Sequence, residues 1–224
     1  MLSHEPTTRD RRLTRLGTSW PLLRRVLLRG EAGWRAATDN HGDGARSQYA
    51  YRERLAALRE EQKLHHGWDR ARVLKIELTV DPERTIAFQT LIGDRHTGMV
   101  TPERPPRNLH PRGPNGQRLL GGDGGTEQLT LFPDHVLPLP PREEIELTEY
   151  ENLQVWVFLV HREHEPDTGR VRWHSELSRP HPPDEAGYLT RWQERVPLPV
   201  LEIGAVTHPV DEGQHELDIQ IGPR

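Results

Sequence analysis

The chain has 224 residues, of which 33% are apolar and 29% charged, with 20 prolines and 19 glycines. This composition is typical of a folded, polar protein with long loops. Cysteine is absent, which excludes disulfides, thiolate nucleophiles and cysteine-ligated metals, so any metal would need His, Asp or Glu ligands. No apolar run approaches the roughly 20 residues of a membrane helix and no secretory signal is visible, so we expect a cytoplasmic protein without a membrane span.

Charge is distributed unevenly along the chain. Residues 1–36 hold eight arginines and three acidic residues, a balance of +5, whereas residues 127–165 hold nine acidic residues and two arginines, a balance of −7. Two such segments can attract each other or face different partners. Lysine occurs only at Lys63 and Lys75, a bias typical of GC-rich bacteria, and neither lysine follows a phosphate-binding glycine loop.

The N-terminal third favours helices. We expect the first twelve residues to form a free arm and Ser19 to be the N-cap of a short basic helix, with Pro21 in its first turn. Its apolar stripe consists of Leu22, Leu23, Val26 and Leu27. After a turn-rich linker at 38–45, a second helix is predicted over residues 46–66, with Gly67 at its C-terminal cap. The positions expected on its apolar face are Tyr51, Leu55, Leu58 and Gln62.

Beyond residue 68 the hydrophobic period changes to two. A strand is predicted at 73–80, and its return at 85–92 completes a β-hairpin over residues 72–92. Residues 93–125 have no period and are rich in proline and glycine. A loop of this length is either functional or disordered, and of the two we favour disorder.

Strand patterns resume in the C-terminal half. Short strands are predicted at 127–132, 136–139, 196–203 and 216–221, with a helical turn at 188–194. Residues 152–161 are apolar on both faces, as in a strand at the centre of a core. A tight turn at 166–169 predicts an antiparallel return over 169–178. Pairing Glu165 with Arg170 in that hairpin sets Glu163 opposite Arg172 and His161 opposite His174.

These patterns predict an α+β fold that is mainly β. We expect an antiparallel β-sandwich or a partly open barrel, preceded by an N-terminal helical region. The expected domains are a basic helical region at 1–68 and a β-rich domain at 69–224 that carries the long loop at 93–125. The sequence alone does not separate a sandwich from a barrel.

One cluster in the predicted hairpin has metal-binding potential. His161, Glu163 and His174 would lie on one face, and two imidazoles with a carboxylate suit zinc, manganese or iron. No HExxH spacing accompanies them, and 13 histidines in the chain produce such neighbours by chance. A hydrogen-bonded cross-strand pair is the simpler interpretation, so no cofactor is expected, with a divalent transition metal as the alternative.

Other chemical motifs are weak. Arg95 and His96 in a glycine-flanked turn could contact an anion, but we favour a plain connecting loop. The acidic stretch 143–151 could meet a basic partner or simply protect a sheet edge. Ser175, next to His174, lies in a predicted strand, and no Gly-x-Ser-x-Gly elbow is present. The sequence therefore favours a protein that is not an enzyme.

The leading functional hypothesis is a non-catalytic interaction or adaptor subunit of a bacterial intracellular multi-protein system, with another protein as its partner. A nucleic-acid-binding accessory protein is the second hypothesis, because the N-terminal region is strongly basic. Its contact residues would be Arg11, Arg12, Arg15, Arg24, Arg25 and Arg29. A metal-dependent hydrolase using His161, Glu163 and His174 is the third. The oligomeric state is left open.

Overall fold

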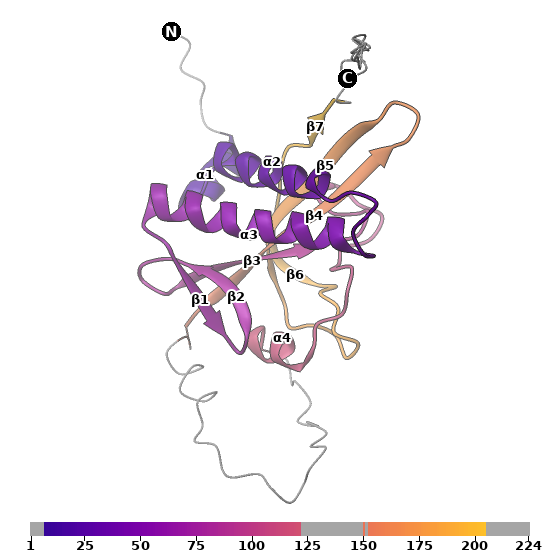
Figure 1. The fold of residues 1–224 in the computed structure, drawn as a ribbon. Helices are drawn as coiled ribbons and strands as arrows, with labels where there is room; N and C mark the ends of the chain where they lie inside the picture. The colour runs from indigo at the N-terminus through magenta and orange to yellow at the C-terminus, as the bar shows by residue number, and fades with distance from the viewer. Residues whose placement is uncertain (1–6, 122–149, 151, 205–224) are drawn as a thin grey trace, which may run out of the picture.

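The computed structural model describes residues 7–121, 150 and 152–204 of the chain. Three helices come first and are followed by a sheet of seven strands, with one more short helix between the third and fourth strands (Figure 1). The helices are α1 (Thr8–Arg15), α2 (Trp20–Ala36), α3 (Ala45–His66) and the short α4 (Pro114–Leu119). The expected α+β class, with helices preceding a mainly antiparallel sheet, is confirmed.

The first helix, α1, lies where a free arm was expected. Thr7 is its N-cap: the Thr7 hydroxyl accepts a hydrogen bond from the Asp10 amide at 3.1 Å, and the Asp10 carboxylate accepts one from the Thr7 amide at 3.1 Å. This reciprocal pair fixes the helix start. Leu13 and Leu16 lie on the inner face of this segment and are buried in the core. The arm prediction is therefore wrong from residue 8 onward.

Helices α2 and α3 form an antiparallel pair across one face of the sheet (Figure 1). Ser19 caps α2, with its hydroxyl accepting from the Leu22 amide at 3.4 Å, and Gly67 ends α3 in the left-handed conformation at φ +70°; both predictions are confirmed. The helices approach closely at Gly33, where a Cβ would lie 2.7 Å from the Tyr49 carbonyl oxygen. No helix in the described ranges is long and apolar enough to cross a membrane.

The buried face of α3 differs from the expected stripe by one position. Leu58 and Gln62 are buried as predicted, but Arg54 is buried where Leu55 was expected, and Leu55 is only half-buried. The hydrophobic period selects Leu55 because only apolar residues count toward it. It does not predict that the side chain of Arg54 packs against α2. The result is a charged group in the core.

The sheet is single, open and mixed. Its strand order is β1-β2-β3-β4-β5-β6, and β7 pairs with β5 beside β6. The strands are β1 (Asp69–Val73), β2 (Ile76–Val80), β3 (Ile86–Ile92), β4 (Gln154–Glu165), β5 (Arg170–Pro180), β6 (Trp192–Pro197) and β7 (Leu201–Ile203). All neighbours are antiparallel except β3 and β4, which run parallel. Within the described residues, its faces are covered by helices and by residues 93–121, and no second sheet is present.

The strand predicted at 73–80 is interrupted by a tight turn. Leu74 and Lys75 have φ values of +49° and +65°, so β1 ends at Val73 and β2 begins at Ile76. Two-residue hairpins of this kind need positive φ at both central positions and usually contain Asn or Gly. Neither residue type is present here, so the alternation of apolar and polar residues in the sequence continues through the turn. The prediction of a single strand over residues 73–80 is therefore wrong at this turn.

Strand β4 is at the centre of the sheet, as predicted, with Val155–Val160 buried on both faces. The predicted register of the β4–β5 hairpin is confirmed: His161 lies opposite His174, and Glu163 lies opposite Arg172. The helical turn predicted at 188–194 is wrong, because β6 begins at Trp192. The strands predicted at 127–132, 136–139 and 216–221 lie outside the described residues.

Each face of the sheet has its own apolar core. On one face, Phe88, Phe158 and Trp173 pack with the leucines of α1, α2 and α3. On the other face, Val157 and Leu159 pack with Leu189 and with the partly buried Leu120. The helices therefore share one core with the sheet, and residues 93–121 and 181–192 cover the side that the helices leave open.

Candidate functional site

Residues 93–121 form an ordered cover on the sheet. The segment begins as a continuation of β3: the Asp94 amide donates to the Arg107 carbonyl at 2.9 Å, and the Leu109 amide donates to the Ile92 carbonyl at 2.8 Å. Gly93 and Asn108 form a β-bridge between these bonds. The expectation of disorder is therefore wrong for residues 93–121, while residues 122–125 lie outside the described part. We call residues 94–107 the folded-back loop.

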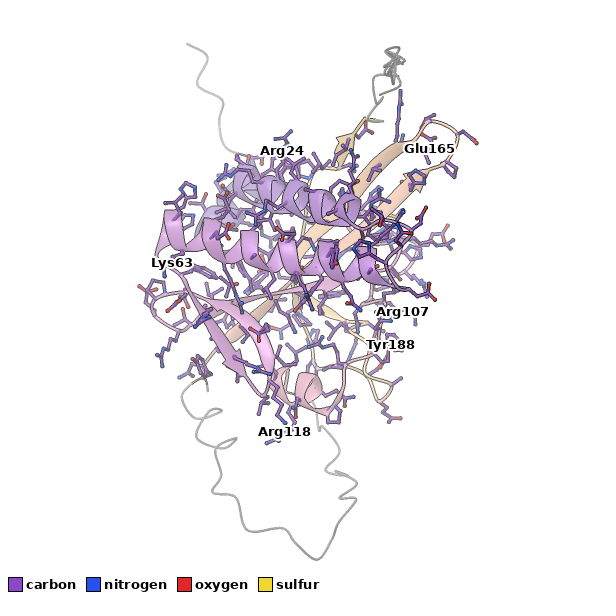
Figure 2. All side chains as sticks on the ribbon, in the orientation of Figure 1. Arg24, Lys63, Arg107, Arg118, Glu165 and Tyr188 are labelled. Carbon is purple, nitrogen blue, oxygen red and sulfur yellow. The ribbon has the colours of Figure 1, made fainter. Side chains whose placement is uncertain are left out.

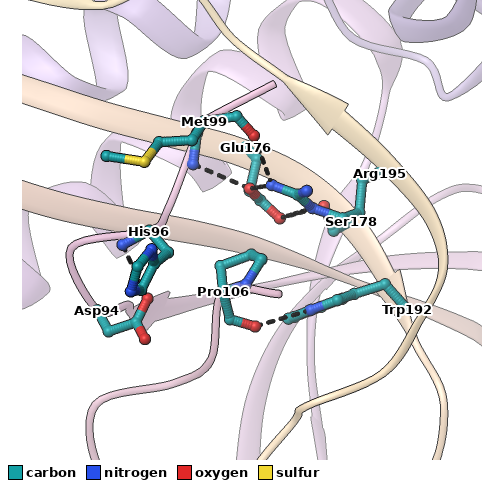
Figure 3. A network of polar contacts seen from close by, with 9 residues as sticks. Asp94, His96, Met99, Pro106, Glu176, Ser178, Trp192 and Arg195 are labelled. Atoms are coloured by element: carbon teal, nitrogen blue, oxygen red, sulfur yellow. Dashed lines mark hydrogen bonds and ion pairs between the residues drawn. The ribbon is translucent and has the colours of Figure 1, made fainter. Parts of the chain in front are cut away.

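Glu176 on β5 holds the folded-back loop against the sheet (Figure 3). Its carboxylate is fully buried and accepts two hydrogen bonds from Arg195 on β6, at 2.5 Å and 3.0 Å. It also accepts from the Ser178 hydroxyl at 2.7 Å and from the Gly98 amide at 2.9 Å. Arg195 in turn donates to the Met99 carbonyl at 3.0 Å. One buried ion pair thus links two strands and the loop.

Gly98 makes this contact possible, and we expect Gly98→Ala to destabilise the protein. Gly98 has φ +74°, and a Cβ there would lie 2.9 Å from both the amide nitrogen and the carbonyl oxygen of Ser175. The conformation alone costs an alanine about 1–2 kcal/mol, and the backbone contact adds to it. Urea denaturation measures the change, and Gly42→Ala, where a Cβ meets nothing, is the control; equal stability of the two variants would contradict the contact.

Asn108 provides a second anchor for the cover. Its amide nitrogen donates to the His110 carbonyl at 2.6 Å, and its amide oxygen accepts from the Leu189 amide at 2.6 Å. Trp192 donates from its indole nitrogen to the Pro106 carbonyl at 2.8 Å (Figure 3). These bonds join residues 106–110 to residues 189–192, so both ends of the folded-back loop are fixed.

Apolar side chains project outward from this fixed segment. Exposed fractions are 41% for Met99, 79% for Val100 and 50% for Leu109. Arg107 stacks on the Tyr188 ring at 4.7 Å, and the two lie beside each other in Figure 2. This anchored segment therefore carries both exposed apolar side chains and arginines.

The three residues predicted as metal ligands share one face, as their register required. His174 Nε2 and the Glu163 carboxylate are 3.1 Å apart, whereas the His161 and His174 rings are 6.2 Å apart. His161 Nδ1 lies 3.3 Å from the Gly93 carbonyl oxygen. Burial lowers the pKa of His161, which favours the neutral form of its ring. In the described ranges no group of three or more His, Asp and Glu side chains is arranged to hold a metal, and the ligand role stays a prediction.

The turn at Arg95 and His96 has a structural role. His96 is only 4% exposed, and its amide donates to the Asp94 carboxylate at 3.1 Å. Arg104 reaches the same carboxylate at 3.3 Å. Asp94 therefore ties the two sides of the folded-back loop together. Arg95 is exposed, so of the predicted pair only the arginine is open to an outside anion.

The six arginines predicted to bind nucleic acid divide into two groups. Arg25 pairs with Glu61 at 2.6 Å, Arg29 pairs with Glu53 and Glu60 at 2.8 Å each, and Arg12 pairs with Glu194 at 3.0 Å. The other three, which are exposed, are Arg11, Arg15 and Arg24. Arg24 points away from the sheet on the outer side of α2 (Figure 2). Half of the predicted basic surface is thus neutralised by acids of the same chain.

Sequence reasoning missed a buried carboxylate on α2. Glu31 is 3% exposed and accepts hydrogen bonds from Arg162 at 2.9 Å and 3.1 Å, from Arg35 at 2.7 Å and from the Trp173 indole at 3.0 Å. Arg162 also stacks on the Trp34 ring at 4.6 Å. Burial alone would raise the pKa of Glu31. The hydrogen bonds from Arg162, Arg35 and Trp173 outweigh burial and hold this pKa below its ordinary value. This network joins α2 to β4 and β5.

Comparison with known proteins gives no identification: no family model, no curated protein and no solved structure matches the chain. A functional conclusion therefore depends on the geometry of the chain itself.

Proposed function

We propose that the protein is a non-catalytic interaction subunit that binds another protein through the folded-back loop. The observation that carries the proposal is the combination of rigid anchoring and apolar exposure in one segment. Glu176 and Asn108 fix the loop from beneath, while Met99 and Val100 remain exposed at its tip. A surface ordered before binding loses less conformational entropy when the partner docks.

The composition of this surface favours a protein partner over a nucleic acid. Exposed Met, Val and Leu side chains gain free energy by leaving water against another apolar surface. The arginines around them are partly committed, since Arg104 pairs with Asp94 and Arg107 stacks on Tyr188. Methionine and arginine are both enriched at protein–protein interfaces. A phosphate backbone would instead require several free cations in a row.

Capture experiments with a loop variant test this function. We expect the double substitution Met99→Ser, Val100→Ser to reduce capture of a specific partner from a lysate of the source organism by at least about tenfold, the effect of losing about 1.4 kcal/mol of binding free energy. Both side chains are exposed, so the melting temperature should stay unchanged. Quantitative mass spectrometry of the eluates measures the ratio.

The matched control is Leu64→Ser, because Leu64 is 78% exposed on α3, outside the loop. Loss of the partner from both variants would indicate nonspecific hydrophobic binding and would contradict the proposal. Retention of the partner by the loop variant would place binding elsewhere. Release of the bound material by nuclease, or stoichiometric zinc, manganese or iron in the eluate, would favour the nucleic-acid or hydrolase hypothesis.

A further inference from the structure

A surface cavity lies between the start of α2 and the end of α3. The two helices are antiparallel, so these ends lie at the same end of the helix pair (Figure 1). The cavity has a volume of about 540 Å³ and is lined by residues of α1, of the turn after it, of the first two turns of α2 and of the last turn of α3. A volume of this size is sufficient for a small organic molecule.

One buried hydroxyl on the wall of this cavity has no partner. Thr18, in the turn between α1 and α2, lines the cavity and is only 2% exposed. Its Oγ1 atom is buried, and within the described residues it has no hydrogen-bond partner. Buried hydroxyls are nearly always paired, because an unpaired one costs free energy. The position of this hydroxyl beside a cavity therefore indicates a partner from outside the chain.

The start of α2 adds further donors to the same cavity. The hydroxyl of Ser19, the N-cap residue, accepts a hydrogen bond from the Leu22 amide at 3.4 Å, and its own O–H can donate. The amide of Trp20, the first helical residue, has no acceptor within the helix. The positive end of the dipole of this 17-residue helix lies here. Donors and dipole together favour an anion.

Three basic side chains also line the cavity: Arg25 of α2, and His65 and His66 of α3. Arg25 Nη2 lies 3.3 Å from His65 Nε2, so two of the three converge. Glu61 accepts hydrogen bonds from Arg25 Nε and Nη2 at 2.8 Å and 2.6 Å, which fixes the guanidinium and leaves Nη1 able to donate elsewhere. In the described ranges no acidic side chain lines this cavity.

We propose that this cavity binds a small organic anion, whose carboxylate or phosphate group accepts hydrogen bonds from Thr18, Arg25 and the start of α2. Hydroxyl, guanidinium and helix N-terminal amide groups are donors that bind such anions. Pro21 and Leu22 supply apolar surface for the carbon part of the ligand. The site is separate from the folded-back loop and does not depend on the proposed partner binding.

Anion-dependent stability of the full chain tests the proposal. The probes are phenyl phosphate and benzoate, each titrated against sodium chloride at constant ionic strength. We expect at least one of them to raise the melting temperature along a saturable curve, because a ligand that binds only the folded state stabilises it. A response to phenyl phosphate alone assigns a phosphate group, and a response to benzoate alone assigns a carboxylate. No greater response to either probe than to chloride would overturn the proposal.

Thr18→Val distinguishes ligand binding from a structural role of the hydroxyl. Valine keeps the shape of threonine and removes the unpaired group, so without added anion the variant should be at least as stable as wild type. Its affinity for the effective anion should nevertheless fall about tenfold, the effect of losing one hydrogen bond to a charged group. Thr90→Val is the matched control, because Thr90 on β3 is also 2% exposed with an unpaired buried hydroxyl but does not line the cavity.

A second pair of variants tests the basic wall. Arg25→Met should weaken the anion response by about tenfold or more, whereas Arg24→Met, on the outer side of the same helix (Figure 2), should leave it unchanged. The Arg25 side chain is 44% exposed, so its replacement leaves the core intact. An undiminished response in Thr18→Val and Arg25→Met would overturn the proposal, as would equal losses in these variants and their controls.

Discussion

Replacing Glu31 by alanine is expected to reduce the free energy of unfolding by about 3–5 kcal/mol, the usual cost of removing one member of a buried ion pair. The substitution leaves Arg162, which is 14% exposed, and the Trp173 indole without their acceptor. The total stability of such a chain is about 5–15 kcal/mol, so the loss is a large part of it. Urea denaturation monitored by circular dichroism measures the change.

Glu53→Ala is the matched control for this prediction. Glu53 lies on the neighbouring helix, pairs with Arg29 at 2.8 Å and is 43% exposed. Exposed pairs of this kind contribute at most about 1 kcal/mol. A Glu31 variant no less stable than the Glu53 variant would show that the buried network contributes little net stability.

The protonation of Glu31 adds a pH dependence to its contribution. Its pKa is lower in the folded protein than in the unfolded chain, so folding favours the ionised form. The stabilisation is therefore complete above the ordinary carboxyl pKa and is lost as pH falls through the lowered folded value. We expect the stability difference between wild type and Glu31→Gln to shrink under acidic conditions, measured by urea denaturation across a pH series.

Glu176→Ala is expected to have an effect of similar size, about 3–5 kcal/mol, for the same reason. It also has a local consequence, because the carboxylate accepts the Gly98 amide hydrogen bond. Without that acceptor the tip of the folded-back loop loses its attachment to β5. Hydrogen exchange at the Gly98 amide should accelerate more than exchange at the Leu109 amide, which bonds to the Ile92 carbonyl instead.

A second variant separates the loop attachment from global stability. Ser178→Ala removes a neutral donor at 2.7 Å from the same carboxylate but keeps Arg195 and the Gly98 contact. We expect a loss of about 1 kcal/mol and little change in Gly98 exchange. If Ser178→Ala releases the loop as fully as Glu176→Ala does, the buried ion pair is not its anchor.

The proposed partner binding connects to this prediction. A loop released by Glu176→Ala still carries Met99 and Val100, but it must be ordered again when the partner docks. We therefore expect weaker capture by this variant than by wild type, although no contact residue has changed. The comparison shows whether rigidity of the loop contributes to affinity.

Much of the helical region and of the β4–β5 hairpin followed from local signals. Ser19, Gly67 and the turn at 166–169 are residues whose short-range chemistry fixes a boundary or a register. The turn at Leu74 and Lys75 has no such signal, so the alternating pattern concealed it. The start of α1 was available in principle, because Thr7 and Asp10 have the spacing of a capping box.

The buried charges could not be read from the sequence. Glu31, Arg54 and Glu176 resemble ordinary surface residues until their long-range contacts, with side chains 19 to 142 positions away, are known. Gly30 and Gly33 offered one indirect signal, since small residues spaced along a helix permit close packing with a second helix. The cover formed by residues 93–121 was missed for a related reason: its order comes from long-range hydrogen bonds rather than from any period.

The parallel pairing of β3 with β4 has a consequence for the order of folding. The hairpins β1–β2, β2–β3 and β4–β5 each close over a few residues. The pairing of β3 with β4 instead joins Ile86 to Gln154, which is more than sixty residues further along the chain. Local hairpins close early and distant pairings late, so we expect two half-sheets to form first and their joining to limit the folding rate. Since closure entropy grows only with the logarithm of loop length, doubling the length of a flexible connection between the halves would cost only about 0.6 kcal/mol.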